Sequence, residues 1–336
     1  MAKRTGSVIE FQTKPAVLGQ AAVGGKFEKE GPLGSSLTET FEDETLGEAS
    51  WEKAETHLQG AAIGHAVQSA GIAMEDIQLH FGGDLLNQCS ATGFTLRGMN
   101  FPYAGIYSAC ASFAQGLALA ATAVESGGAS ISSVCGSSHF CSAEKQFRYP
   151  LAAGVQPPPT AQRTATAAGA AILGKGNGPV VSKAIFGRVV DFGVENANEM
   201  GAAMAPAALD TLGRFLEDTA TGPEDYDLIL TGDLGEIGTT LLRELAQKEL
   251  GCDLANVHRD GGLLLYDVKN QDVGVGGSGL GCSAAVVCAD VLPKLGRGEL
   301  HKVLFIGTGA LLSAISPLQG ETIPAVAHAV LLEGSI

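Results

Sequence analysis

The sequence predicts an α/β protein, a layered α-β-α-β-α sandwich built from two duplicated halves. Three observations lead to this prediction. Short apolar strands alternate with helices, the same features occur twice in the same order, and the longest expected helices are apolar on nearly every side. A chain of 336 residues is long enough to bury the core that such a fold requires.

The first repeated feature is a short apolar strand that ends in Gly-Asp-Leu. It occupies residues 76–85, and its counterpart occupies residues 226–234. Glycine after a strand is a common turn signal, so this pair alone would be weak evidence. The order in which the later features follow it makes the duplication convincing.

A helix of small and apolar residues comes next in each half. The first follows Ser108-Ala109-Cys110 and runs to Val124, and the second follows Gly281-Cys282-Ser283 and runs to Leu295. Because both helices are apolar all round, we expect them to lie between two sheets. A strand is expected after each helix, at residues 130–134 and 301–306, followed by the turns 136–139 and 307–309.

A pair of apolar strands, residues 167–173 and 325–332, closes the two halves. The run Gly-Lys-Gly-Asn-Gly-Pro near residues 175–179 interrupts the apolar pattern between them. We therefore predict an N-terminal half over residues 1–176 and a C-terminal half over residues 177–336. The first half has an N-terminal extension before Trp51 and an insertion around 142–163. This insertion and residues 314–324 are expected to be loops that cap a site.

The composition restricts the partners and the compartment. A net charge of −15 argues against nucleic acid, which needs clustered Lys and Arg. Only 17% of the residues are charged, which favours a surface partly covered by a second subunit. The seven cysteines show no CxxC spacing, so we expect reduced thiols and no zinc site. We see no secretory leader and no apolar run of membrane-spanning length, and expect a soluble protein.

Ligands of open α/β sheets bind beyond the carboxyl ends of the strands, so the expected post-strand turns are where a site is predicted. Cys110 is the principal candidate because it follows an expected strand, residues 103–107, and begins a helix. The helix dipole would lower the pKa of such a thiol and favour nucleophilic chemistry. The alternative is a buried cysteine that only packs.

The segment Tyr107-Ser108-Ala109-Cys110-Ala111-Ser112 resembles the nucleophile turn of thiolases and ketoacyl synthases. This resemblance implies a thiolase-like fold and a cysteine that attacks a thioester with the help of a histidine and either an asparagine or a second histidine. At the corresponding positions this sequence has Thr231-Gly232-Asp233 and Gly281-Cys282-Ser283. Losing such groups costs a factor of order 10² or more each, so an acyl-transferring or condensing enzyme using Cys110 is the alternative reading.

A closer resemblance covers almost the whole chain. Five stretches are similar, in the same order, to the stage V sporulation protein AD family: residues 30–34, 83–88, 144–150, 204–208 and 307–313. The resemblance implies a non-catalytic binding protein for dipicolinic acid or its calcium chelate, which supports uptake of that ligand into the developing spore. It also implies a homodimer and membrane-embedded sporulation proteins as partners. The expected location is cytoplasmic or peripheral at the spore inner membrane, with no cofactor except calcium carried by the ligand.

Several side chains have chemistry that suits dipicolinate, a flat pyridine with two carboxylates. Arg148 could grip a carboxylate with two parallel hydrogen bonds, or it could only pair with Glu144. Asp84 and Asp233 could reach calcium, or they could cap the following turns. The complete set of expected ligand-binding residues is Asp84, Asn87, Gln88, Cys110, Ser137, Ser138, His139, Glu144, Arg148, Asp233, Cys282, Gly307, Gly309 and His328.

The two histidines in this set were chosen because an imidazole can stack on a pyridine ring or donate a hydrogen bond to it. His139 follows an expected strand, whereas His328 lies inside the apolar run 325–332. A histidine in such a run is often only a hydrogen-bonded core residue. Both interpretations of His328 stay open at this point.

Overall fold

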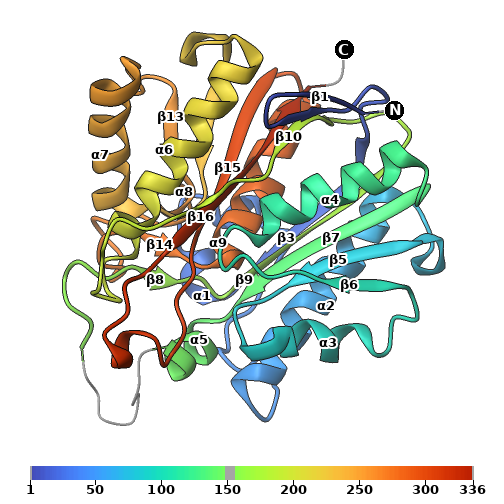
Figure 1. Ribbon diagram of the computed structural model, residues 1–336. Helices are drawn as coiled ribbons and strands as arrows, with labels where there is room; N and C mark the ends of the chain where they lie inside the picture. Colours follow the sequence, from blue (N-terminus) through green and yellow to red (C-terminus); the bar gives the residue numbers. More distant parts are fainter. Residues whose placement is uncertain (1, 148–155, 335–336) are drawn as a thin grey trace.

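The computed structural model describes residues 2–147 and 156–334 and has the predicted layered α/β architecture (Figure 1). Its main sheet path runs in the order β13-β12-β15-β16-β10-β3-β9-β7-β5-β6. The path contains five strands from each half of the chain. The N-terminal set is β3 (Ala16–Gly24), β9 (Ala167–Gly174), β7 (Ile131–Ser138), β5 (Leu79–Gly83) and β6 (Tyr103–Gly105).

The C-terminal set repeats this arrangement. Its strands are β10 (Val180–Ile185), β16 (Ala325–Glu333), β15 (Lys302–Ala310), β12 (Leu228–Thr231) and β13 (His258–Asp260). In each set the last three strands are parallel and the first two are antiparallel to their neighbours. The two sets meet through a single pair between β3 and β10, Ala16 with Val180.

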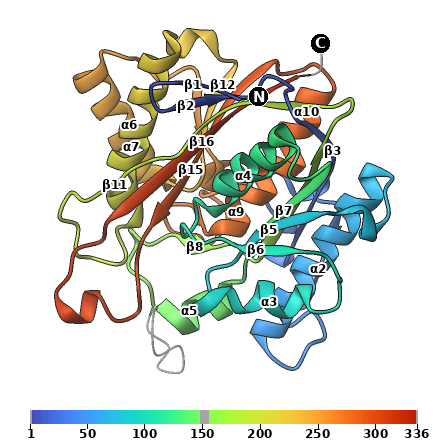
Figure 2. The ribbon, with the colours of Figure 1, turned by 45° about the vertical axis from the view of Figure 1, so that its right-hand side comes forward.

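Helices form three layers around the two strand sets. The central layer contains α4 (Ser112–Ser126) and α9 (Leu280–Val286), and every residue of α9 is buried. The outer layers contain α2 (Trp51–Ala70) and α3 (Ser90–Leu96) on one side, with α6 (Met200–Thr219) and α7 (Gly235–Leu245) on the other. Figure 2 shows α4 and α9 between these two outer layers. The apolar composition of the central helices therefore matches their place between two sheets.

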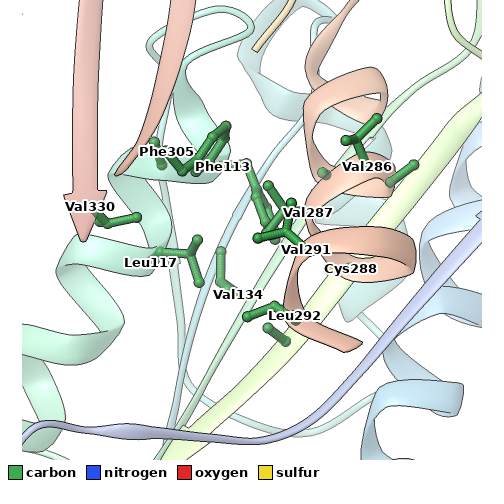
Figure 3. Close-up of a cluster of buried hydrophobic side chains, with 14 of the residues drawn as sticks. Phe113, Leu117, Val134, Val286, Val287, Cys288, Val291, Leu292, Phe305 and Val330 are labelled. Atoms are coloured by element: carbon green, nitrogen blue, oxygen red, sulfur yellow. The ribbon is translucent and has the colours of Figure 1, made fainter. Parts of the chain in front are cut away.

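The central core joins the two halves directly. Phe113 of α4 and Phe305 of β15 have ring centroids 6.5 Å apart. Leu117 of the first half and Val330 of the second lie in the same cluster as Val287, in the chain that continues α9 (Figure 3). Helix α4 thus packs on strands from both sets.

Smaller elements complete the fold. The short strands are β1 (Lys3–Thr5), β2 (Val8–Glu10), β4 (Glu39–Thr40), β8 (Arg163–Thr164), β11 (Val189–Val190) and β14 (Gly277–Ser278). The remaining α-helices are α1 (Lys26–Lys29), α5 (Phe140–Phe147), α8 (Gly261–Leu265) and α10 (Leu292–Gly296). The expected helix to Leu295 is interrupted, because a π-helical turn, Val287–Val291, separates α9 from α10.

Two groups of expected turns are instead parts of strands. Gly136 to Ser138 belong to β7, and Gly307 to Gly309 belong to β15. A Cβ on Gly309 would come within 2.2 Å of the Ser108 carbonyl oxygen, and one on Gly307 within 2.8 Å of the Ala114 Cβ. These glycines therefore serve the close packing of β15 on the start of α4.

The N-terminal extension before Trp51 supplies a central strand, because β3 lies in the middle of the sheet and most of its residues are buried. One other expectation needs correction. The insertion from residue 142, expected to be a loop, begins inside helix α5.

Candidate functional site

A cavity opens beside Cys110, at the turn that leads from β6 into α4. The cavity is narrow: the volume open to the centre of a water-sized sphere is about 50 Å³, and the empty space between the lining atoms, including the open mouth, is about 500 Å³. Cys110 is 7% exposed, so its sulfur is close to this space without being freely accessible. The lining consists of Leu85, Tyr107, Ala109, Cys110, Ala143, Glu144, Phe147, Thr164, Met200, Ser278, Ala310 and Leu312.

The turn that carries Cys110 has a strained backbone. Ala109 has a φ of +48°, in the left-handed region that residues other than glycine rarely adopt. The Ser112 hydroxyl holds this turn, because it accepts a hydrogen bond from the Ser108 N–H at 2.8 Å and donates one to the Ala109 carbonyl at 2.8 Å. Strain of this kind persists where the surrounding structure fixes it, so the position of the thiol is well determined.

The Cys110 thiol lies close enough to the buried carboxylate of Asp233 for each group to affect the pKa of the other. Asp233 accepts hydrogen bonds from the Gly279 N–H at 2.8 Å, the Ser278 hydroxyl at 3.2 Å and the Thr308 hydroxyl at 2.8 Å. The structure therefore brings together two residues that the sequence predicted for one site. It also adds Ser278, which lines the cavity and was not predicted.

This environment disfavours the nucleophilic form of Cys110. Burial, together with the nearby Asp233 carboxylate, raises the pKa of the Cys110 thiol well above its usual value. Burial also raises the pKa of Asp233 to about 7. A thiol that is protonated at neutral pH is a poor nucleophile, so the favourable helix-dipole effect expected from the sequence is outweighed here.

Asp84 lies behind the cavity and is fully buried. Its carboxylate accepts hydrogen bonds from the backbone N–H groups of Leu86 at 2.9 Å and Thr92 at 2.7 Å, and from the Thr92 hydroxyl at 2.6 Å. These bonds hold the turn after β5, as in the capping interpretation. In this arrangement the Asp84 carboxylate is engaged in hydrogen bonds within the protein.

A buried polar network connects this turn to the cavity wall. Gln59 donates hydrogen bonds to the hydroxyls of Thr92 and Ser137, each at 2.9 Å. Ser137 in turn donates to Glu55 at 2.9 Å, and Ser142 donates to the other oxygen of Glu55 at 2.7 Å. Because Ser142 belongs to α5, the network positions the helix that supplies Ala143, Glu144 and Phe147 to the cavity.

Several predicted site residues have structural partners and do not line the cavity. His328 is buried, with Nε2 at 3.0 Å from the Ser108 hydroxyl and Nδ1 accepting from the Gly187 N–H at 3.0 Å. Burial lowers its pKa to about 4. The ring of His139 lies 2.7 Å from the Glu44 carbonyl and accepts from the Cys141 N–H. Both imidazoles are thus satisfied within the protein.

The remaining serine and cysteine of the set also have structural roles. Ser138 donates to the Ala165 carbonyl at 2.7 Å and accepts from the Gly281 N–H at 3.1 Å, so it ties β7 to the start of α9. Cys282 is fully buried inside α9, and the turn before that helix is formed by the residues up to Gly279. The turn that was expected to contain Cys282 therefore lies a few residues earlier in the chain.

A second hollow adjoins the mouth of the cavity, since both share Tyr107, Phe147 and Leu312 in their lining. Asn87 and Gln88 lie in this outer hollow. The predicted residues Cys110, Glu144, Asn87 and Gln88 therefore lie along one path from the interior to solvent. Arg148 falls outside the described residues.

The sequence did not identify most of the cavity wall. Ten of its twelve residues were absent from the predicted set, among them Tyr107, Thr164 and Ser278. Leu312 lies in the motif 307–313, so that motif could have identified it as a residue of the site. In the described parts of the chain, no group of three or more histidine, cysteine, aspartate or glutamate side chains is placed to hold a metal ion. No described helix is long and apolar enough to cross a membrane.

Solved structures with a similar fold include a 3-oxoacyl-[acyl-carrier-protein] synthase III and OleA. The 3-oxoacyl-[acyl-carrier-protein] synthase III of Aquifex aeolicus VF5 is 14% identical, with a TM-score of 0.57, and the match covers 95% of this chain and 99% of that one. The cerulenin-bound OleA of Xanthomonas campestris is 15% identical with a TM-score of 0.63, and the match covers 98% of this chain and 99% of that one. At this level of identity the similarity establishes the thiolase-like fold alone.

Sequence comparison identifies nearer relatives. A curated relative, "Stage V sporulation protein AD" of Bacillus subtilis (strain 168), is 39% identical over 310 residues, or 92% of this chain and 91% of the relative. A family model described as "Stage V sporulation protein AD (SpoVAD)" matches residues 5–333. The chain therefore belongs to the stage V sporulation protein AD family.

Proposed function

We propose that this protein binds dipicolinate, chiefly as its calcium chelate, in the cavity beside Cys110. The observation that supports the proposal is the cavity itself, at the position where the fold would otherwise carry out acyl chemistry. Its apolar walls suit a flat aromatic ring, and the hydroxyls of Tyr107 and Thr164 can donate hydrogen bonds to carboxylate oxygens.

The described lining of the cavity favours the chelate over the free ligand, because it has no lysine, arginine or histidine to neutralise the ligand carboxylates. Calcium would neutralise them, and it can accept a further oxygen ligand. The calcium then arrives with the ligand and is not a resident cofactor.

We expect Leu312→Trp to weaken binding of calcium dipicolinate by about tenfold or more, because the indole would fill the shared neck of the cavity and the outer hollow. Isothermal titration calorimetry with dipicolinate, in the presence and absence of calcium, measures the effect. Leu318→Trp is the matched control: Leu318 lies in the same loop, is 86% exposed and lines neither space. Equal affinities for both variants would place the ligand elsewhere.

The alternative function is acyl transfer through Cys110, which the strained turn and the cavity favour. Against it, the Cys110 thiol is buried, and burial together with the nearby Asp233 carboxylate raises its pKa. We expect iodoacetamide to label Cys110 on the order of tenfold more slowly than the more exposed Cys252, and Asp233→Asn to accelerate that labelling. Mass spectrometry of the peptides measures both rates. A Cys110 adduct formed from acyl-CoA would instead favour the enzyme.

The partners expected from the family resemblance, a second copy of the chain and membrane-embedded sporulation proteins, stay predictions. β6 ends the sheet path, and Tyr103 on this edge is 39% exposed. Unpaired strand edges commonly pair with another chain, which supports the predicted homodimer.

A further inference from the structure

A second candidate site is built around Arg163, away from the Cys110 cavity. The guanidinium carbon of Arg163 lies 3.8 Å from the ring centroid of Phe27 and 3.9 Å from that of Phe140. Phe27 belongs to α1 and Phe140 begins α5, so two separate helices hold the planar group between them. Stacking on both faces fixes the plane and leaves only its edge available to a partner.

The edge of the Arg163 guanidinium has no hydrogen-bond or ion-pair partner among the described residues. Among residues 2–147 and 156–334, the Arg163 side chain makes no hydrogen bond and no ion pair, and its Nε is buried without an acceptor. The carboxylate of Glu28 interacts electrostatically with Arg163 but forms no hydrogen bond with it. Its hydrogen bonds come from the Tyr266 hydroxyl and the Thr166 N–H. Burial also raises the pKa of Glu28, which weakens its ability to neutralise Arg163.

The edge opens into a cavity of about 710 Å³, measured out to its mouth. Pro158 contributes to an apolar wall, Gln156 supplies an exposed amide, and Asp272 lies at the rim. Gln162 also lines the cavity, but its amide donates to the carbonyls of Asp233 and Gly277. The unpartnered donors of Arg163 are therefore the main fixed positive group of this space.

A two-stranded ribbon separates this cavity from the one beside Cys110. The ribbon consists of β8 and β14, with Arg163 opposite Gly277 and Thr164 opposite Ser278 (Figure 1). Successive residues of a strand point to opposite faces. Accordingly, Thr164 and Ser278 line the Cys110 cavity, Arg163 lines the second one, and the two spaces share no lining residue.

We propose that the Arg163 cavity binds an oxyanion, with two of its oxygens in the plane of the guanidinium. A carboxylate and a phosphate both match this two-pronged geometry. The carboxylate of Asp272 at the rim favours a singly charged carboxylate over a phosphate dianion. The site takes a small organic carboxylate and is independent of the proposed calcium dipicolinate site.

Benzoate and inorganic phosphate are the probes for this site, each titrated by calorimetry into the full chain at roughly millimolar concentration. We expect benzoate to bind, and Arg163→Gln to weaken that binding by about tenfold or more. Arg163→Lys, which keeps the charge but loses the planar fork, should give an intermediate loss. Arg97→Gln is the matched control, because Arg97 also stacks on a phenyl ring, Phe94, but lies outside this cavity.

Two further results decide the assignment. Benzoate should bind Leu312→Trp as it binds the unmodified protein, which separates this site from the dipicolinate site. If Arg163→Gln does not fold, as judged by thermal unfolding, Arg163→Lys replaces it in the comparison. Unchanged benzoate affinity in the folded Arg163 variant would overturn the proposal, and tighter binding of phosphate would overturn the assignment to a carboxylate.

Discussion

Asp260→Ala is expected to lower the free energy of unfolding by on the order of 5 kcal/mol, a large part of the stability of a typical domain. The buried carboxylate accepts hydrogen bonds from the backbone N–H groups of Leu234 at 2.7 Å, Gly235 at 3.0 Å and Gly262 at 3.1 Å, and from the Thr231 hydroxyl at 2.7 Å. Alanine would leave these donors buried without a partner. Urea unfolding of the purified variant measures the difference.

The matched control for this substitution is Asp253→Ala. Asp253 is exposed, and its carboxylate accepts one backbone hydrogen bond, from Ala255 at 2.9 Å. Its loss should change stability by less than about 1 kcal/mol. Similar losses in the two variants would mean that Asp260 does not organise the turn containing Asp233, and that the Cys110 cavity depends on other contacts.

The stability of the folded protein is expected to fall as the pH rises from about 6.5 to about 8. Burial raises the pKa of Asp233 to about 7 and that of Asp260 to about 6, and it also raises the pKa of Glu55. These acids hold protons in the folded protein that they have lost in the unfolded chain, where they ionise near pH 4. Each excess proton lowers the unfolding free energy by about 1.4 kcal/mol per pH unit.

Other carboxylates set the acidic limit of this range. The pKa values of Asp210 and Asp227 are lowered, Asp210 by its arginine partners and Asp227 by backbone hydrogen bonds, although burial opposes both shifts. Their contribution is complete above about pH 4 and is lost on further acidification. Burial also lowers the pKa values of His80, His139, His258 and His328, so the unfolded chain binds more protons at these imidazoles below about pH 6.5. Stability therefore falls on acidification from that pH, and its maximum is expected near pH 6.5. Urea unfolding at several pH values measures the curve. Asp233→Asn should flatten it, and stability that rises steadily to pH 8 would contradict the prediction.

The sequence predicted the fold well because the same strands and helices recur in the same order in both halves of the chain. Two apolar helices without a polar face can only be buried between layers, and this inference is confirmed by α4 and α9. Strand ends were less predictable, since glycines at 307 and 309 signal a turn locally. These glycines are needed for the close approach of β15 to the Ser108 turn. That contact joins residues about 200 positions apart, so no local sequence pattern predicts it.

The site was predicted in part. Cys110 and Asp233 were identified because both follow strands, and the structure places them close enough to affect each other's pKa. The carboxylate of Glu55 was missed, although it had a signal: Glu55 and Gln59 are four residues apart on the face of α2 that also carries Leu58 and Ala62. Polar residues on a buried helix face need partners, and these came from distant segments that no spacing rule connects.

The shared middle layer has a consequence for how the molecule unfolds. Duplication alone would suggest two autonomous folding units, but α4 packs on strands of both halves, and the core around Phe113 includes Phe305. In a fragment ending at β9, the face of α4 that packs on β15 and β16 would be exposed to water. The two halves must consequently fold and unfold together, in one cooperative transition.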